Sequence, residues 1–322
     1  MGEFELIARY FTRPVRRSPL GVGDDCALLQ PSAGMQLAVS TDLLVEGRHF
    51  LSTVDPWRLG HKALAVNLSD LAACGARPLA FTLSLALPQA DEHWLAAFAE
   101  GLFALADAHG CELVGGDTTR GPLCIGVTVF GEVPAGQALL RSGARPGDEL
   151  WVSGTIGDAR LALEAFRGTV SLPQAVFDAA RLRLEQPQPR VALGQALVGV
   201  ASAAIDISDG LLGDLRHVLQ RSGVGAVVEA APAAGLLAAR QAGFDPGFER
   251  LLDLVLAGGD DYELAFTAPA PQRAAVEAAA AQAGTPVTRI GAIRAEPGLR
   301  VLDASGAPVQ RDFGSFDHFR SP

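Results

Sequence analysis

Hydrophobic and polar positions follow a helical period in some stretches of the chain and form short apolar runs in others. In residues 3–12, Phe4, Ile7 and Phe11 recur at helical spacing. A longer helical pattern begins at Asp55-Pro56, where proline suits the first helical position. In the first part of the chain, the patterns predict helices over residues 3–12, 56–74 and 91–109, and strands over residues 21–29, 37–39, 79–87, 113–117 and 123–133.

The second part of the chain repeats this mixture after a connector over residues 138–147. Its patterns predict strands over residues 149–153, 203–206, 287–293 and 299–302, a further strand from residue 264, and helices over residues 158–166, 173–185, 190–200, 211–219 and 271–283. The sequence therefore predicts an α/β (α+β) protein with two domains, residues 1–137 and 138–322.

Composition and charge narrow the classes of function. The chain has 322 residues, of which 49% are hydrophobic and 19% charged, as in soluble globular enzymes. Its formal net charge of −10 argues against binding to nucleic acid or to an anionic membrane surface. The acidic N-terminus lacks the apolar segment of a signal peptide, and no apolar run reaches transmembrane length, so we expect a cytoplasmic protein. Lys62, the only lysine, does not follow a phosphate-binding G-x-x-x-x-G pattern, which excludes a Walker site.

Acidic residues recur where predicted strands end. Asp42 follows Ser40 and Thr41, Asp117 follows two glycines, and Asp206 ends the strand over residues 203–206. The carboxylate and hydroxyl oxygens of these residues would lie at the rim of an α/β sheet, and such oxygen ligands suit Mg²⁺ better than zinc. A turn or helix cap is the alternative at each position, since Ser, Thr and Asp favour both.

Three further acids lie in other settings. Only one of Asp24 and Asp25 is expected to face a site from the glycine-rich loop, and a plain turn explains that loop equally well. Asp70 shares a helix face with Asn67 among apolar neighbours, which favours a metal ligand over a hydrogen-bonded core residue. Asp209 could cap the helix that follows it.

Taken together, these acids predict a metal site for phosphate chemistry. Carboxylates repel one another, and several of them lie close together only where bound cations offset their negative charge. Several Mg²⁺ ions bridging phosphate oxygens would satisfy the set, which comprises Asp25, Asp42, Asp70, Asp117, Asp206 and Asp209.

Six motifs, in order along essentially the whole chain, resemble those of the thiamine-monophosphate kinase family. They are residues 21–25, 40–50, 62–73, 115–119, 205–210 and 258–264. The family is related to aminoimidazole ribonucleotide synthetase and selenophosphate synthetase. The resemblance implies their two-domain fold, an N-terminal sheet that pairs with that of a partner to form a homodimer, and binding of ATP and metal by the N-terminal domain. It also implies ATP-dependent phosphorylation of thiamine monophosphate to thiamine diphosphate.

The resemblance also implies roles for individual residues. The implied Mg²⁺ ligands are Asp25, Ser40, Thr41, Asp42, Asp70, Asp117, Asp206 and Asp209, the implied ATP contacts are Gly116, Asp117, Arg141 and Ser208, and the implied thiamine-phosphate contacts are His49, Asp260 and Phe316. The family usually has Glu at the position of Asp260, and often Tyr or Trp at that of Phe316. His49 and Phe316 could otherwise be structural, and Arg141 a solvated linker residue.

We expect direct phosphoryl transfer without a covalent nucleophile or a general base. The acceptor phosphate has a second pKa near about 6 and is largely a dianion at neutral pH. One alternative is another ATP-dependent enzyme of the superfamily, although no Cys precedes the Gly21 loop as a selenophosphate synthetase would require. A second alternative is a non-catalytic protein that senses nucleotide or metal.

Overall fold

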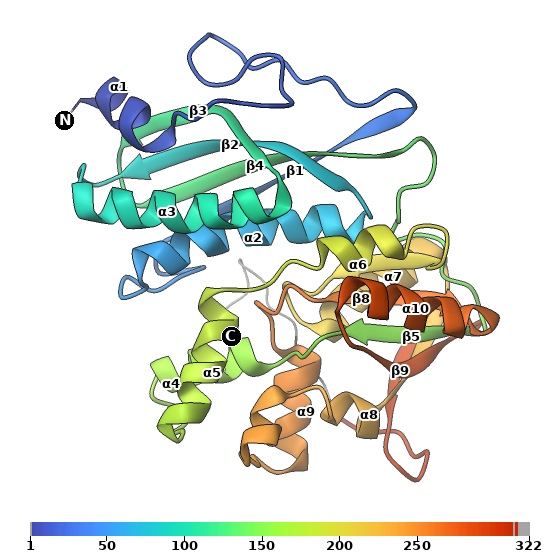
Figure 1. The fold of residues 1–322 in the computed structure, drawn as a ribbon. Helices are drawn as coiled ribbons and strands as arrows, with labels where there is room; N and C mark the ends of the chain where they lie inside the picture. The colour runs from blue at the N-terminus through green and yellow to red at the C-terminus, as the bar shows by residue number, and fades with distance from the viewer. Residues whose placement is uncertain (1, 312, 315–322) are drawn as a thin grey trace. The chain divides into compact units, whose positions relative to one another are not determined.

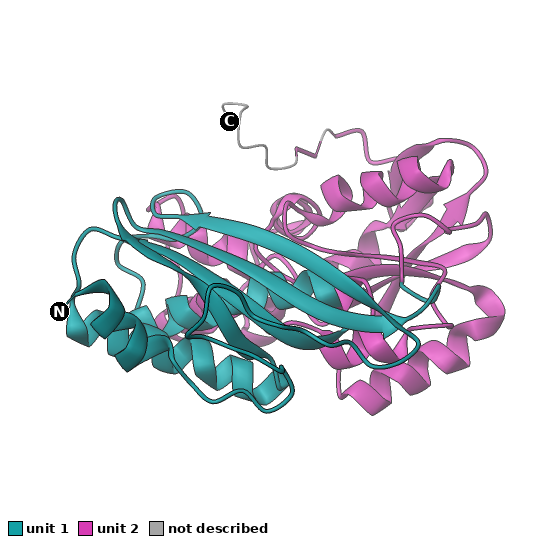
Figure 2. Cartoon of the chain, turned by 90° about the horizontal axis from the view of Figure 1, so that it is seen from above, with its two compact units in different colours: residues 1–71, 76–138 teal, residues 72–75, 139–322 magenta. Residues whose placement is uncertain are grey.

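The computed structural model describes residues 2–311, 313 and 314, which form two compact units. Unit 1 comprises residues 1–71 and 76–138, and unit 2 comprises residues 72–75 and 139–322 (Figure 2). Both units mix helices and strands, as the sequence predicts. The expected domain boundary between residues 137 and 138 stays a prediction.

Unit 1 is built on a sheet of four strands in the order β1-β4-β2-β3. Strands β2 and β3 are parallel, and the other two pairs are antiparallel. Helices α2 and α3 lie on the same side of this sheet (Figure 1). The elements are α1 Glu3–Leu6, η1 Ile7–Phe11, β1 Met35–Val45, α2 Pro56–Ala73, β2 Arg77–Leu87, α3 Glu92–His109, β3 Glu112–Arg120 and β4 Cys124–Pro134.

Local chemistry explains where the two long helices of unit 1 begin. The Asp91 carboxylate accepts the N–H groups of His93 and Trp94 at the start of α3. The Asp55 carboxylate accepts the N–H of Arg58 at 3.2 Å beside the proline that opens α2. Most of α2 is buried, including the polar residues His61, Asn67 and Ser69, so the helix packs within unit 1 on more than one side.

Unit 2 contains a sheet of six strands in the order β10-β7-β9-β5-β8-β6. Only β10 and β7 are parallel. The elements are β5 Asp148–Ser153, α4 Asp158–Phe166, α5 Gln174–Glu185, α6 Val191–Ala196, β6 Ala203–Asp206, α7 Leu211–Ser222, β7 Gly225–Glu229, α8 Ala230–Ala234, η2 Ala238–Ala242, α9 Phe248–Ala257, β8 Leu264–Pro269, η3 Ala270–Gln272, α10 Arg273–Ala283, β9 Val287–Arg294 and β10 Gly298–Leu302.

Three predicted strands differ from the structure. Residues 21–29 form bends and isolated bridges, because the polar and glycine residues there find no continuous partner strand. The strands expected to end at Val39 and at Asp117 instead continue to Val45 and Arg120. Polar residues within these strands pair with β4 and β2, so polarity did not mark the strand ends.

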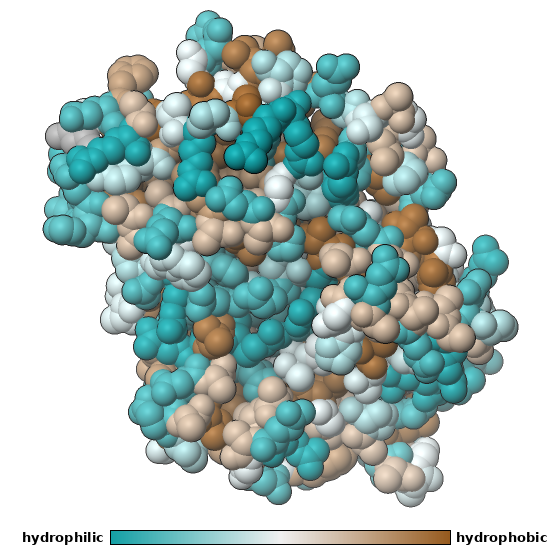
Figure 3. All heavy atoms as spheres, viewed as in Figure 1, coloured by the Kyte–Doolittle hydropathy of each residue, from teal (hydrophilic) through white to brown (hydrophobic). Residues whose placement is uncertain are grey.

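The surface is mixed in character. Figure 3 shows hydrophilic residues over much of the visible face, with apolar residues among them. Among the described residues, no helix is both long and apolar enough to span a membrane.

Candidate functional site

Strand β1 and helix α2 bring together three predicted metal ligands, Ser40, Asp42 and Asp70. Ser40 and Asp42 lie two residues apart on the same face of β1. The Ser40 hydroxyl donates to Asp70 Oδ2 at 2.5 Å. The backbone N–H of Asp42 donates to Asn67 Oδ1 at 3.0 Å, and the Asn67 amide donates in turn to the carbonyl of Ala63. These bonds fix β1 against α2, so the oxygen donors are held by regular elements.

Thr41 differs from its neighbours on β1. Its side chain lies on the opposite face, where its hydroxyl donates to the carbonyl of Val127 and accepts from the hydroxyl of Thr128, each at 3.0 Å. A metal on the side of Ser40 and Asp42 could therefore meet only the backbone of Thr41. The assignment of Thr41 as a ligand stays a prediction.

Gly116 and Asp117 lie inside β3 rather than beyond its end. Asp117 pairs with Ser84 of β2, and both residues are exposed. Gly116 has a φ of 148°, and a Cβ atom there would lie 1.8 Å from the carbonyl oxygen of Leu83. The sheet itself therefore requires glycine at position 116, whether or not a phosphate also approaches it.

Two other predicted residues of unit 1 lie in loops. Asp25 is exposed, and its N–H donates to the carboxylate of Asp24 at 2.9 Å. His49 is half-buried, and its Nδ1 accepts the N–H of Val45 at 2.9 Å. Because Nδ1 acts as an acceptor, neutral His49 carries its proton on Nε2. That nitrogen can donate a hydrogen bond but cannot take up a proton.

In unit 2, the end of β6 forms an acidic loop. Asp206 is buried at the last position of β6, as the sequence predicts. The N-cap residue of helix α7 is Gly210, so Asp209 lies one residue before the cap position. The carboxylate of Asp214 accepts the N–H groups of Ser208 and Asp209 at 3.0 and 3.1 Å. Burial, together with the nearby charge of Asp209, raises the pKa of Asp214 to about 7 despite the lowering effect of these N–H groups.

The segment that carries Asp260 lies beside this loop. The N–H of Asp260 donates to the carbonyl of Ser208, and the N–H of Tyr262 donates to the carbonyl of Ile207, each at 2.8 Å. The Tyr262 hydroxyl donates to Asp260 Oδ1 at 3.2 Å. The predicted thiamine-phosphate contact and the predicted metal ligands of unit 2 therefore share one backbone framework.

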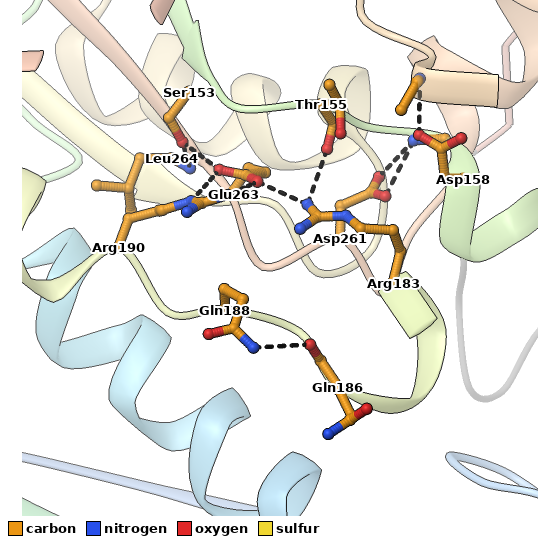
Figure 4. A network of polar contacts seen from close by, with 12 residues as sticks. Ser153, Thr155, Asp158, Arg183, Gln186, Gln188, Arg190, Asp261, Glu263 and Leu264 are labelled. Atoms are coloured by element: carbon orange, nitrogen blue, oxygen red, sulfur yellow. Dashed lines mark hydrogen bonds and ion pairs between the residues drawn. The ribbon is translucent and has the colours of Figure 1, made fainter. Parts of the chain in front are cut away.

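A buried polar network follows directly after Tyr262 (Figure 4). Glu263 is fully buried and accepts hydrogen bonds from Arg183, Arg190 and Ser153. The neighbouring carboxylate of Asp261 accepts the N–H of Gly157 at 2.9 Å. Burial raises the pKa of Asp261 well above its usual value, against the lowering effect of that N–H. Sequence patterns did not identify this network, although charged residues directly before the apolar β8 are its visible signal.

Arg141 lines a cavity of about 550 Å³ together with His217, Gln220 and Arg221 of α7. The hydroxyl of Ser222 accepts the N–H groups of Gly143 and Ala144 at 3.1 and 3.2 Å and donates to the carbonyl of Arg141. The loop that carries Arg141 is thereby fixed to the last turn of α7. The cavity gathers cationic side chains in an acidic protein, which suits an anionic ligand.

The donor chemistry fits Mg²⁺. Within residues 2–311, 313 and 314, no three His, Cys, Asp or Glu side chains form a group that could hold a metal ion. Mg²⁺ commonly binds through one or two carboxylates and completes its shell with water and substrate phosphates. The pair Asp42 and Asp70 in unit 1, and the pair Asp206 and Asp209 in unit 2, are sets of this size. Phe316 lies outside the described residues.

Comparison with known proteins identifies relatives over the full chain. Residues 23–133 match the N-terminal domain of AIR synthase related proteins, and residues 145–304 match their C-terminal domain. The thiamine-monophosphate kinase of Salmonella typhimurium is 48% identical over 100% of this chain and 99% of its own.

Two solved structures are also similar. The thiamine-monophosphate kinase of Stenotrophomonas maltophilia K279a has a TM-score of 0.82 at 47% identity, covering 92% of this chain and 94% of its own. A structure described as AaThiL complexed with AMPPCP and TMP has a TM-score of 0.75 at 30% identity, covering 90% and 89%.

Proposed function

This chain belongs to the AIR synthase related proteins and, within them, to the thiamine-monophosphate kinase family, and from that premise we propose that it transfers a phosphoryl group from ATP to thiamine monophosphate. The observation that carries the proposal is the 48% identity over the whole chain. The two sets of oxygen donors, one in each unit, support it because phosphoryl transfer needs such groups.

Asp42 and Asp70 in unit 1, and Asp206 and Asp209 in unit 2, are the proposed Mg²⁺ ligands. Ser40 orients Asp70 through their 2.5 Å hydrogen bond, and Asp214 fixes the backbone that carries Asp209. Mg²⁺ held by these oxygens would neutralise the negative charge that develops on the phosphates during transfer.

On the acceptor side, the proposal assigns His49 and Asp260 to thiamine monophosphate. The Nε2–H of His49 can donate to a phosphate oxygen, because the Val45 N–H occupies Nδ1. The Asp260 carboxylate carries the charge opposite to that of the thiazolium ring. Since Nε2 already holds its proton and the acceptor is a dianion, direct transfer without a protein base is the mechanism that these groups support.

On the nucleotide side, the proposal assigns Arg141 and the cavity that it lines on unit 2 to a phosphate group of ATP. Arg221 lines the same cavity and would add positive charge around that group, and His217 would offer a hydrogen bond. Ser208 of unit 2 would offer its hydroxyl to the nucleotide. Gly116 and Asp117 stay the predicted nucleotide contacts of unit 1.

We also propose that the chain forms a homodimer through the sheet of unit 1. Leu37, Val39 and Leu43 of β1 are 43%, 56% and 58% exposed. They alternate with Ser40 and Asp42 and so lie on the sheet face away from α2. A row of exposed apolar side chains on a sheet face is typical of an interface. Light scattering of the wild type and of Val39→Asp tests this, with a dimer expected for the first and a monomer for the second.

The proposed activity is tested by ADP release from ATP and Mg²⁺ with three acceptor conditions: thiamine monophosphate, thiamine, or none. Rapid ADP release only with thiamine monophosphate supports the proposal. Release that requires a different acceptor would assign the chain to another ATP-dependent reaction. Nucleotide binding without turnover under any of these conditions would instead indicate a non-catalytic protein that senses nucleotide or metal.

A further inference from the structure

The turn that carries Asp260 has a backbone that its own sequence does not favour. Asp260 and Tyr262 have φ values of 64° and 52°, in the left-handed region that residues with side chains rarely adopt. Such conformations persist only where the surrounding structure imposes them, and they are concentrated at functional sites. Contacts on both sides of this turn must therefore hold it.

On one side, the turn is bonded to the acidic loop. Besides the bonds from Asp260 to Ser208 and from Tyr262 to Ile207, the N–H of Ile207 donates to the carbonyl of Glu263 at 2.8 Å. The two segments thus form an alternating set of backbone hydrogen bonds. A shift of Glu263 would move the Asp260 carboxylate and the backbone of Ser208 together.

On the other side, the side chain of Glu263 is held by three neighbouring side chains. Arg190 bonds both carboxylate oxygens, with Nε at 2.6 Å from Oε2 and Nη2 at 2.5 Å from Oε1. Arg183 Nη2 donates to Oε1 at 2.6 Å and to the carbonyl of Thr155 at 3.1 Å. The Ser153 hydroxyl donates to Oε2 at 2.6 Å. A bidentate arginine fixes direction as well as distance.

Gly154 shows how closely this site is packed. Its φ is 55°, and a Cβ atom there would lie 2.2 Å from Glu263 Oε1. The Ser153 hydroxyl, which donates to Glu263, also accepts the N–H of Leu264 at 2.8 Å. These contacts hold the Glu263 carboxylate in one position. They also bond the start of β8, at Leu264, to the same Ser153 hydroxyl.

We propose that Arg183 and Arg190 are positioning residues for phosphoryl transfer: by holding Glu263, they impose the left-handed turn that presents Asp260 and align it with the acidic loop at Ser208. This inference rests on the proposed function for the identity of the substrate. The positioning itself concerns the backbone of unit 2 and can be measured without substrate.

Arg183→Gln is the test variant, and Arg181→Gln is its matched control. Both arginines lie on α5, and each pairs with a glutamate whose side chain is almost entirely buried: Arg181 Nε lies 2.9 Å from Glu185 Oε2. Both variants remove one positive charge and one ion pair from the same helix. Only Arg183→Gln removes a hydrogen bond to Glu263.

The first measurement is hydrogen exchange of the peptides that contain residues 205–210 and 258–263, without ligand. Arg183→Gln is expected to accelerate exchange of both peptides together, because the N–H groups of Asp260, Tyr262 and Ile207 bridge them. Arg181→Gln is expected to leave both unchanged. Equal exchange in the two variants would overturn the proposal.

The second measurement determines KM for thiamine monophosphate and kcat separately in each variant. A loss of folded enzyme lowers the apparent kcat but leaves KM unchanged. Arg183→Gln is expected to raise the KM for thiamine monophosphate about 10- to 100-fold, the range that corresponds to one charge-assisted hydrogen bond. Arg183→Lys keeps the charge and one donor and should recover part of this loss. An unchanged KM in Arg183→Gln with a lowered kcat would make the network purely structural.

The two proposals fail separately. Wild-type protein that does not phosphorylate thiamine monophosphate would refute the proposed function, and hydrogen exchange would still decide the positioning role. Active wild-type protein with unaltered exchange in Arg183→Gln would refute the positioning role alone.

Discussion

Substitution of Gly116 by alanine tests whether the sheet of unit 1 dictates the geometry beside Asp117. A Cβ atom at Gly116 would lie 1.8 Å from the carbonyl oxygen of Leu83, which is backbone and cannot rotate away. The φ of 148° adds strain for any residue with a side chain. Strain of this kind costs about 1–3 kcal/mol, and overpacking costs about 1–3 kcal/mol more. We expect Gly116→Ala to lose about 2–6 kcal/mol of unfolding free energy.

Gly115→Ala is the control, because this neighbouring glycine has no such constraint. Its nearest neighbour would be Thr82 Cγ2 at 3.8 Å, an ordinary contact. Alanine there should change stability by less than about 1 kcal/mol, since it also restricts the unfolded chain.

Thermal unfolding measures the difference between the two variants. At about 2–4 °C per kcal/mol, Gly116→Ala should melt about 4–24 °C below the wild type. Gly115→Ala should melt within about 4 °C of the wild type. The KM for ATP should rise in Gly116→Ala as Asp117 is displaced. Equal melting temperatures for the two variants would refute the reasoning from the Leu83 contact.

Three further predictions address the metal, the histidine and the response to acid. Asp42→Asn should keep the wild-type melting temperature but lose most turnover at every Mg²⁺ concentration, because an amide is a poorer ligand; near-normal turnover would remove Asp42 from the metal site. His49→Ala should raise the KM for thiamine monophosphate, and added imidazole should not restore turnover, since His49 already holds a proton on Nε2. Hydrogen bonding from Arg273 lowers the pKa of Glu149 in the folded protein, against the effect of burial. The ionised Glu149 therefore stabilises the fold above its unfolded pKa of about 4.5, and this stabilisation is lost as pH falls through its folded pKa. The stability difference between the wild type and Glu149→Gln, measured by denaturant titration, should therefore shrink below about pH 4.5, and a constant difference would contradict this.

The fold class and most long elements could be predicted from the sequence because their signals are local. The helical period and the Asp55-Pro56 start identified α2 within a residue or two. The helices and strand between residues 225 and 257 were not predicted. The short segments α8 and η2 are alanine-rich and carry little periodicity. Helix α9 does carry apolar residues at helical spacing, so its pattern was missed. The lengths of β1 and β3 were wrong, since pairing with β4 and β2 overrides the polarity of Ser40 and Asp117.

The site divides in the same way. The motifs named the acids and His49, but they could not show that Asn67 joins α2 to the backbone of Asp42. Nor could they show that the Asp214 carboxylate bonds the backbone of Ser208 and Asp209 before α7. Glu263 and its two arginines are separated by 73 and 80 residues, and only folding brings them together. Contacts of this kind depend on tertiary packing and leave no local pattern.

Transfer of label from γ-labelled ATP tests the central claim most directly. The protein, Mg²⁺ and γ-labelled ATP are mixed with thiamine monophosphate, and the denatured protein and the small molecules are then separated and counted. Direct transfer predicts that the label appears in thiamine diphosphate, in proportion to the ADP formed, with none on the protein even when the acceptor is omitted. Label that fails to reach thiamine diphosphate would contradict the proposed activity. A stoichiometric phosphoprotein that passes its label to the acceptor would contradict the direct mechanism.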